Sequence, residues 1–535
     1  MMISLSGKIR DRIPASASAA PKPCSPPPTT RGSKRGRKPA AALPDRTGST
    51  PAIPEAARPA LEAAALRIFR NLEHVLESAY SLGSPDVIVH LLDDVIPKWA
   101  HASGRSIMEA LLLHERGFMG STLACPGCEQ GALRFEGDRP RGVRTMCGQI
   151  KVRRSYYVCD SCGHSVAPLD LELGLEGDPD ATGELGFLPS VQEIVGLAGS
   201  RMSFPDATSF IKKILPDPPS LRTVERITRS LGQSAQRERN RERLQAYQDP
   251  AKSTFPTCEA EATPEVAVVA VDGGMCRMRT ASEPYREFKM AVAGRISPAP
   301  RLKKEEQPPN VLDKTYTATF EGPDALFELC GLEYARLGLD RAPVVQFLGD
   351  GAPWIWKRVR DLVQPGQRLV ETLDFYHACD HIREAAHAYF GPDSKPGRDW
   401  QKARQSQLLA GKVDAFLRSL GNLARKAGKA GRVPEAESIG SRHAYFRERR
   451  HQLNYKQCLA EGLLIGSGMI EGGIRSVGKD RLHRTGMRWS EAGAEAVLTL
   501  RCLASSGRWD RFCHSRAEAR ATRYQAFRQA ASRAA

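Results

Sequence analysis

Two short apolar runs in this chain each end in an aspartate followed by a glycine, and this pattern constrains the fold most. The runs are VAVVAVDGG, which contains Asp272, and VVQFLGDGAP, which contains Asp350. Short runs rich in β-branched residues are typical of buried strands, and ligands bind where such strands emerge at a sheet edge. Glu471, in LLIGSGMIEGG, opens a segment predicted to be helical. We therefore expect three carboxylates to meet at one sheet edge.

The predicted elements around these acids have an informative order. Three carboxylates at one place suit hard divalent cations, and two such ions promote an in-line phosphoryl displacement. The alternative is chance, because 61 acidic residues will place some after apolar runs. The order strand, strand, strand, helix, strand, helix, strand is that of an RNase H-like fold. The strands are expected at about 265–271, 287–294, 315–320, 343–348 and 368–374, and the helices at about 323–338 and 354–362.

Six short segments occur along about 120–510 in an order that is specific to one group of proteins. They are VDGG, DGAPWIW, DFYHACDH, IGSGMIEGG, GMRWS and LRCLASSGRWD. Together they resemble bacterial insertion-sequence transposases of the ISKra type, which are distantly similar to Mutator-like transposases. The resemblance implies a DDE mechanism in which Asp272, Asp350 and Glu471 are the catalytic acids that bind Mg²⁺ or Mn²⁺. Glycines follow Glu471 directly, and each costs a helix about 0.5–1 kcal/mol relative to alanine.

Four cysteines have the paired spacing of a metal site. The two CxxC pairs are separated by a strand-like run, IKVRRSYYVC, and consist of Cys125, Cys128, Cys159 and Cys162. This spacing predicts a zinc ribbon in which four thiolates hold a structural Zn²⁺ and leave no open position for water. Incidental buried cysteines are the alternative. Cys147 and His164 lie nearby in the sequence and are expected to support packing rather than to bind the metal.

The charge of the chain predicts a polyanionic partner. Among 535 residues, 78 Lys+Arg exceed 61 Asp+Glu, and the formal charge of +17 favours DNA over a membrane surface. No run of about 18 apolar residues occurs, and the first residues lack the apolar core of a signal peptide. We therefore expect a cytoplasmic, nucleoid-associated protein. Its thirteen cysteines favour reduced thiols over a disulfide framework.

Residues near the acids are predicted to assist them. By the family resemblance, Asp374 and His377 in DFYHACDH would contact DNA or brace the site, and His377 and His381 would share a helix face. The alternative for the histidine is a role in ordering the start of the helix. Trp489 would stack on an unpaired base, although tryptophans such as this are more often in a core. The side chains predicted to neutralise phosphates are Arg475, Lys479, Arg481, Arg484 and Arg488.

A basic N-terminal segment carries a further DNA-binding motif. The hexapeptide KRGRKP contains Arg35 and Arg37 and resembles the core of an AT-hook, which enters the minor groove. The alternative is a solvated tail with only non-specific phosphate contacts. A second candidate is a helix with Arg222, Arg226 and Arg229, which would be the recognition helix of a helix-turn-helix or part of a plain helical bundle.

The predicted fold class is multidomain α/β. An RNase H-like catalytic core with an α-helical insertion is preceded by a zinc ribbon and a helical, helix-turn-helix-like DNA-binding region. The predicted organisation is a disordered basic tail at 1–59, a helical region at 60–119, the zinc ribbon at 120–170, the helix-turn-helix-like region at 186–250, the first segment of the RNase H-like core at 262–389, the helical insertion at 390–460 and the second segment of the core, with Glu471, at 461–512.

The expected function is that of an insertion-sequence DNA transposase. It would bind the terminal repeats of its element, cleave DNA with divalent ions bridged by Asp272, and join the free 3′ end to target DNA. A homodimer or larger synaptic complex is expected because two DNA ends must be held together. The alternatives are an RNase H-like site-specific nuclease or resolvase, and a domesticated zinc-ribbon DNA-binding protein that no longer cuts.

Overall fold

A computed structural model describes residues 55–81, 87–128, 131–175, 186–248, 255–256, 258, 263–280, 282–300 and 309–532. These residues belong to one unit, Glu55–Ala535, and show a mixed α/β fold with two sheets. The other unit, Met1–Pro54, lies outside the described residues, and with it the predicted minor-groove arm of Arg35 and Arg37. No helix in the described ranges is both long and apolar enough to cross a membrane.

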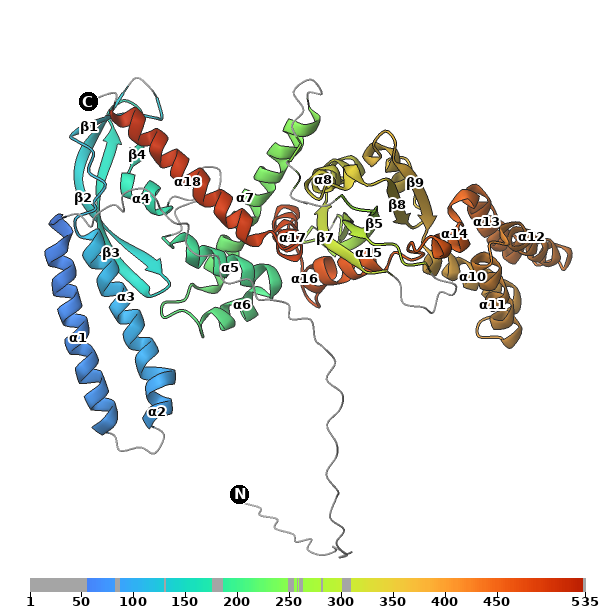
Figure 1. Ribbon diagram of the computed structural model, residues 1–535, viewed down its shortest axis with the longest axis horizontal. Coiled ribbons are helices and arrows are strands. Elements are labelled where there is room, and N and C mark those ends of the chain that lie inside the picture. Colours follow the sequence, from blue (N-terminus) through green and yellow to red (C-terminus); the bar gives the residue numbers. More distant parts are fainter. Residues whose placement is uncertain are drawn as a thin grey trace, which may run out of the picture. The chain divides into compact units, whose positions relative to one another are not determined.

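A five-stranded sheet with the order β7-β6-β5-β8-β9 contains Asp272 in β5 and is followed by Asp350 directly after β8 (Figure 1). Neighbours among β5, β6 and β7 are antiparallel, whereas β8 and β9 run parallel to β5. The predicted order of strands and helices is present. The elements are β5 (Val266–Arg277), β6 (Tyr285–Ile296), β7 (Val311–Thr319), α8 (Pro323–Arg336), η4 (Leu339–Arg341), β8 (Val344–Gly349), α9 (Pro353–Trp356), η5 (Val359–Leu362), β9 (Arg368–Leu373) and α10 (Phe375–Phe390).

Strand β5 is longer than the sequence predicted. Its parallel pairing with β8 ends at Val271 and Gly349, but its antiparallel pairing with β6 continues to Arg277. Asp272 therefore lies within β5, at the position where the neighbouring parallel strand has just ended. The predicted strand end at 271 was wrong because β6 continues to supply hydrogen-bond partners beyond the apolar run. Gly274 fits this strand because a Cβ there would lie 2.3 Å from the Phe288 ring.

Both faces of the five-stranded sheet are buried, as its continuous apolar runs predict. Alternate residues of β5 belong to two different cores, with Val268 and Ala270 in one and Val269 and Val271 in the other. Side chains of α8, α9 and η5 complete the core that contains Val269. Side chains from α10 and from the elements after it complete the core that contains Val268.

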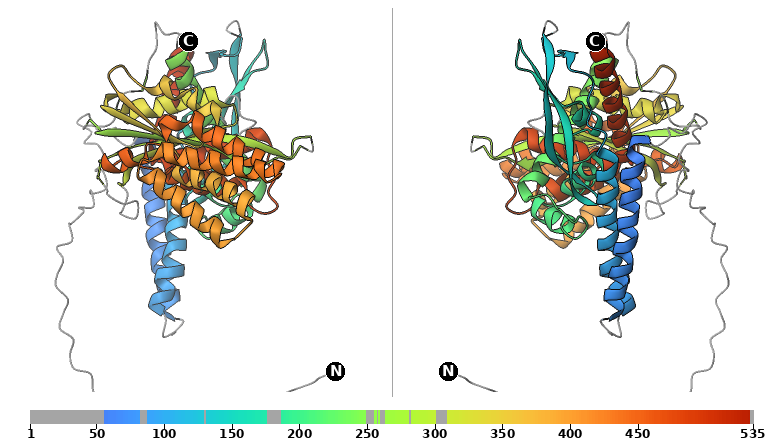
Figure 2. Two further views of the ribbon diagram at one scale, coloured as in Figure 1. Left: turned by 90° about the vertical axis from the view of Figure 1, so that its right-hand side faces the viewer. Right: turned by 90° about the vertical axis from the view of Figure 1, so that its left-hand side faces the viewer.

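The segment predicted as a helical insertion contains only helices, and Figure 2 shows several of them side by side. Phe416 and Phe446, from two of these helices, stack edge to face with ring centroids 5.0 Å apart. The chain then returns to the sheet with helices that carry Glu471. The elements are α11 (Lys395–Leu409), α12 (Val413–Lys429), α13 (Val433–Glu448), η6 (Arg450–Gln452), α14 (Tyr455–Ala460), α15 (Gly468–Gly473), the π-helical η7 (Ile474–Lys479), α16 (Asp480–Leu482) and α17 (Glu491–Ser505).

The N-terminal elements form a helical hairpin and a second, antiparallel sheet of four strands. Helices α1 and α3 lie side by side (Figure 2). The elements are η1 (Glu55–Ala57), α1 (Arg58–Ser81), α2 (Val87–His90), η2 (Leu91–Val95), α3 (Ile96–Leu112), β1 (Thr122–Ala124), β2 (Ala132–Thr145), β3 (Gly148–Cys159), β4 (Ser165–Val166) and α4 (Pro168–Leu173).

Two long helices connect the N-terminal elements with those around the five-stranded sheet. Helix α7 packs closely on α17, where a Cβ on Gly232 would lie 2.4 Å from the Ala496 carbonyl oxygen. Helix α18 was not predicted, and its Phe527 packs in the core beside Tyr157 of β3. Helix α17 thus covers the middle of α7, whereas Arg222 and Arg226 in the first turns of α7 are exposed. The helices are α5 (Pro189–Arg201), α6 (Phe204–Ile211), α7 (Leu221–Tyr247) and α18 (Trp509–Ser532).

Candidate functional site

The register of β5 with β8 brings Asp272 and Asp350 together. Val271 pairs with Gly349, and these two residues directly precede Asp272 and Asp350 in the chain. The Asp272 Oδ1 accepts a hydrogen bond of 2.7 Å from the Gly273 N–H. Burial raises the pKa of Asp272 to about 6, and the Asp350 and Glu471 carboxylates add to this shift, against the opposing effects of Gly273 and Lys479. The charges of Asp350 and Glu471 thus both act on Asp272.

Asp350 is held by the turn that follows β8. Its Oδ1 accepts a hydrogen bond of 2.9 Å from the Ala352 N–H, and its carbonyl oxygen accepts one of 2.7 Å from the Trp356 indole. Trp356 is partly buried and packs against the core on one face of the sheet. The backbone of the DGAPWIW segment therefore orients the carboxylate.

Glu471 lies in helix α15, and close packing explains the glycines that follow it. A Cβ on Gly473 would lie 2.9 Å from the Tyr316 ring and 3.4 Å from the Met290 sulfur, and Met290 is the register partner of Asp272. Gly478 makes a similarly close approach to Phe288. Gly473 and Gly478 each lower the stability of the helix, but each allows the helix to pack directly against the sheet. Gly472 is different, because no atom lies within 4 Å of the Cβ position there.

Asp374 braces the two halves of the site. It is 1% exposed, so a direct contact with DNA, one of the two predicted roles, is wrong. One carboxylate oxygen accepts hydrogen bonds from the backbone N–H and the hydroxyl of Ser467, while the other accepts one of 2.6 Å from the His377 N–H. The Asp374 N–H donates to the Gly349 carbonyl at 2.9 Å. Asp374 therefore joins the end of β8, the start of α10 and the N-terminus of the helix that carries Glu471.

The two histidines of α10 share one face of the helix, as the sequence predicted. Their ring centroids are 4.9 Å apart. Burial lowers the pKa of His381, and His377 lowers it further. Burial raises the pKa of Glu471, the carboxylates of Asp374 and Asp380 raise it further, and His377 opposes them. His377 is thus the histidine whose charge acts on a predicted catalytic acid.

The helical insertion contributes to the site through residues that sequence reasoning missed. Arg449 donates two hydrogen bonds, of 3.2 and 2.7 Å, to the carbonyl oxygen of Gly351, which follows Asp350. Tyr445 packs on Gly351 so closely that a Cβ there would lie 2.2 Å from its ring, and its ring centroid is 4.3 Å from that of His381. Tyr445 and Arg449 are almost a hundred positions from Asp350 and belong to no motif. Gly351 itself was the only local signal.

The basic residues after Glu471 fall into two groups. Four of them are exposed, namely Arg475, Lys479, Arg484 and Arg488. Arg481 is buried, with its guanidinium 4.7 Å from the ring centroids of both Phe204 and Trp489. Trp489 is 7% exposed, and its indole N–H donates to the Leu482 carbonyl at 3.1 Å. The predictions of a phosphate contact by Arg481 and of base stacking by Trp489 were therefore wrong, because these side chains pack against each other in the core.

The four predicted cysteines come together at the end of the N-terminal sheet. The sulfurs of Cys125 and Cys162 are 3.6 Å apart, and those of Cys128 and Cys159 are 3.7 Å apart. A tetrahedral site with Zn–S bonds of about 2.3 Å has sulfurs about 3.8 Å apart. The Gly127 N–H also donates to the Cys125 sulfur at 3.3 Å. These distances fit a structural zinc ion and are too long for disulfides.

Two thiols of this cluster have pKa values that are shifted in opposite directions. Hydrogen bonds from the Cys162 and Ser161 backbone lower the pKa of Cys159 to about 6. For Cys162, the His164 N–H lowers the pKa, but burial and the three neighbouring thiols raise it overall, to about 12. One thiolate therefore suppresses ionisation of another, and a divalent cation would remove this conflict. The side chains of Cys147 and His164 are not part of the cluster.

The acids and the cysteines differ in how closely they approach. Within the described ranges, only the four cysteines bring three or more ligand atoms within 4.8 Å of one another. Asp272, Asp350 and Glu471 do not belong to such a group in these ranges, although the charges of Asp350 and Glu471 act on Asp272. No protein-family model and no curated protein sequence matches the chain.

The two adjacent glycines after Glu471 provide a matched test of this packing. Gly473→Ala should lower the free energy of unfolding by about 1–3 kcal/mol, because its methyl group would collide with Tyr316. Gly472→Ala should raise it by about 0.5–1 kcal/mol, because the methyl group meets no atom and alanine favours the helix. Urea denaturation of both variants measures the difference. Equal stabilisation by both alanines would contradict the described contact between α15 and the sheet.

Proposed function

We propose that this protein is an insertion-sequence transposase with an RNase H-like core. The observation that carries the proposal is that the charges of Asp350, directly after β8, and Glu471, in the helix α15, both act on Asp272 of the neighbouring strand β5. The strand order, with three antiparallel strands and two parallel ones, supports the RNase H-like assignment. The resemblance of the segments around Asp272, Asp350 and Glu471 to ISKra-type transposases supports the reaction.

In the proposed mechanism, Asp272, Asp350 and Glu471 would hold two Mg²⁺ or Mn²⁺ ions. When bound, such ions would activate a water or a 3′ hydroxyl of DNA and stabilise the leaving oxygen. Asp272 is the acid on which the charges of both other carboxylates act. Asp374 keeps the helix of Glu471 against the end of β8, and Arg449 restrains the backbone after Asp350. These residues hold the acids in place before DNA binds.

The exposed cations near the acids are proposed to hold the DNA backbone. Arg475, Lys479 and Arg488 are exposed and follow Glu471 in the chain, and the charge of Lys479 acts on Asp272. Cations in these positions would neutralise phosphates beside the bond that is cut. His377 is proposed to adjust the ionisation of Glu471.

The cysteine cluster is proposed to be a zinc ribbon that supports the DNA-binding region of the protein. Four thiolates complete a tetrahedral site, so the ion there stabilises the fold rather than taking part in catalysis. The proposed partners are the terminal repeats of the element and target DNA, with two or more subunits in a synaptic complex on the nucleoid. The alternatives remain a site-specific nuclease or resolvase and a domesticated DNA-binding protein.

Neutral amides at the three acids test the proposed chemistry. Asp272→Asn, Asp350→Asn and Glu471→Gln should each reduce Mg²⁺-dependent cleavage of labelled element ends by at least about 100-fold, because an amide weakens metal coordination with little change in shape. Binding of the ends should change little. Asp340→Asn is the matched control, because this aspartate is exposed and lies outside the site.

The products distinguish the three functions. Joined strands support a transposase, cleavage without joining supports a nuclease or resolvase, and binding without cleavage by the natural sequence supports a domesticated protein. Full cleavage by any one of the three amide variants would remove that acid from the proposed site.

Metal analysis tests the zinc ribbon independently of DNA cleavage. The purified, reduced protein should contain about one Zn²⁺ per chain, and Cys125→Ser or Cys159→Ser should abolish this zinc and lower the melting temperature, since metal binding stabilises the folded state directly. Cys147→Ser should leave the zinc content unchanged, because that thiol lies outside the cluster. The assignment would be contradicted if the natural protein contained no zinc, or if all three cysteine variants lost zinc equally.

A further inference from the structure

A basic groove lies between α7 and α18, on elements that carry none of the predicted catalytic acids. Both helices pack against α17 and diverge from it (Figure 1). The groove has a volume of about 1000 Å³. Among the described residues, five arginines line it, and Glu238 is the one acidic residue of the lining. The arginines are Arg237 and Arg241 of α7, and Arg516, Arg520 and Arg523 of α18. We propose that this groove binds the phosphodiester backbone of duplex DNA, at a distance from the bond that is cut.

Three of these arginines are available for a ligand. Arg241, Arg520 and Arg523 make no hydrogen bond or ion pair with any described part of the chain. Arg520 is half-buried, burial lowers its pKa, and Arg523 lowers it further against the effect of Glu193. Glu238 is already engaged, because its carboxylate accepts a hydrogen bond of 2.8 Å from the Ser515 hydroxyl. The groove therefore concentrates positive charge that an anionic ligand would neutralise.

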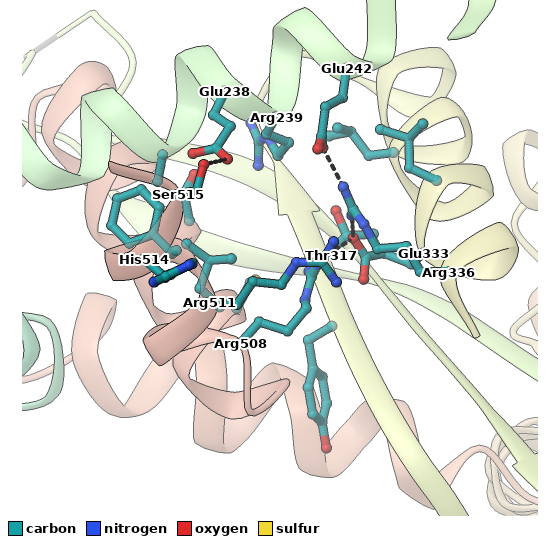
Figure 3. Close-up of a pocket in the computed structure, with 18 of the residues that line it drawn as sticks. Glu238, Arg239, Glu242, Thr317, Glu333, Arg336, Arg508, Arg511, His514 and Ser515 are labelled. Atoms are coloured by element: carbon teal, nitrogen blue, oxygen red, sulfur yellow. Dashed lines mark hydrogen bonds and ion pairs between the residues drawn. The ribbon is translucent and has the colours of Figure 1, made fainter. Parts of the chain in front are cut away.

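A neighbouring cavity shows the opposite arrangement of charge. It has a volume of about 320 Å³ and shares Glu238 and Ser515 with the groove (Figure 3). Its charged side chains pair with one another, since Glu333 forms ion pairs with Arg336 at 2.5 Å and with Arg508 at 2.8 Å. Arg336 also forms an ion pair with Glu242. These paired charges hold α7, α8 and the residue before α18 together, whereas Arg241, Arg520 and Arg523 of the groove have no such partner among the described residues.

The composition of the lining favours duplex DNA over other polyanions. No aromatic ring of the described residues lines the groove, and binding of single strands usually depends on stacking of bases against such rings. An acidic protein partner would usually offer an apolar interface core, but the groove is lined mainly by arginine, amide and hydroxyl side chains. Arginine forks and amide groups are common ligands of phosphate oxygens in protein–DNA interfaces.

The inference extends the proposed function and rests on it in one respect, namely that the natural partner is DNA. The acids lie on β5, in the turn after β8 and on α15, and no described residue of β5, β8 or α15 lines the groove. A duplex held there would be contacted outside the cleaved phosphate. Substitution of the groove arginines should therefore weaken binding of duplex DNA without moving the position of the cut.

Salt-dependent binding of a labelled duplex tests the groove. The triple variant R241Q/R520Q/R523Q of the zinc-loaded, full-length protein should reduce the slope of log affinity against log salt by about 2–3, since each phosphate contact contributes about 0.9. Its affinity at low salt should fall by at least about tenfold. The matched control R58Q/R67Q/R70Q removes three exposed arginines of α1 and should keep the natural slope. The variant R241K/R520K/R523K retains the charges and should recover most of the slope.

Further measurements decide between the outcomes. Melting temperature and zinc content establish that each variant is folded. An unchanged slope in a folded triple glutamine variant would overturn the proposal, as would equal losses in the α1 control. The proposal would also be overturned if the triple glutamine variant lost binding to single-stranded DNA or to polyglutamate but still bound duplex DNA normally. If the natural protein cuts no DNA while the slopes differ as expected, the groove stands and the transposase proposal fails. If the natural protein cleaves DNA with a metal ion but the natural and triple-variant slopes are equal, the groove proposal fails and the transposase proposal stands.

Discussion

The parallel pairing of β5 with β8 is the constraint on which the candidate site depends. Its last pair, Val271 with Gly349, places two aspartates beside each other as the next residues of their strands. Because β5 continues along β6 while β8 ends, Asp272 is held by a strand and Asp350 by a turn. The other elements of the site assemble against this edge. Asp374 ties the end of β8 to the helix of Glu471, and the insertion reaches Gly351 through Arg449.

Close approach of the backbone is the second requirement, and glycines provide it. Gly473 and Gly478 allow α15 and η7 to lie directly on the sheet, and Gly351 allows α13 to contact the turn after Asp350. Burial raises the pKa of Asp272 to about 6, and the charges of Asp350 and Glu471 add to this shift. Bound cations would relieve this repulsion in the proposed function.

The sequence predicted those features of the fold that depend on local patterns. Short apolar runs predict buried strands, and the central strands of the sheet are present. Paired CxxC spacing predicts a cluster of four cysteines, and this cluster is also present. Contacts between distant segments could not be predicted in the same way. The roles of Tyr445, Arg449 and helix α18 depend on which surfaces meet in three dimensions. Trp489 and Arg481 were misassigned because exposure cannot be inferred from residue type near a motif.

The central claim is that Asp272, Asp350 and Glu471 hold the same ions, and iron-directed cleavage of the backbone tests it directly. Fe²⁺ would replace Mg²⁺ in zinc-loaded protein, and radicals generated at the bound iron with ascorbate and peroxide would cut nearby peptide bonds. Mass spectrometry would then locate the cuts. The account predicts cuts beside all three acids, which excess Mg²⁺ suppresses and Asp272→Asn removes together. Cuts beside β5 and β8 but none near Glu471, or cuts that persist in Asp272→Asn, would contradict a shared metal site.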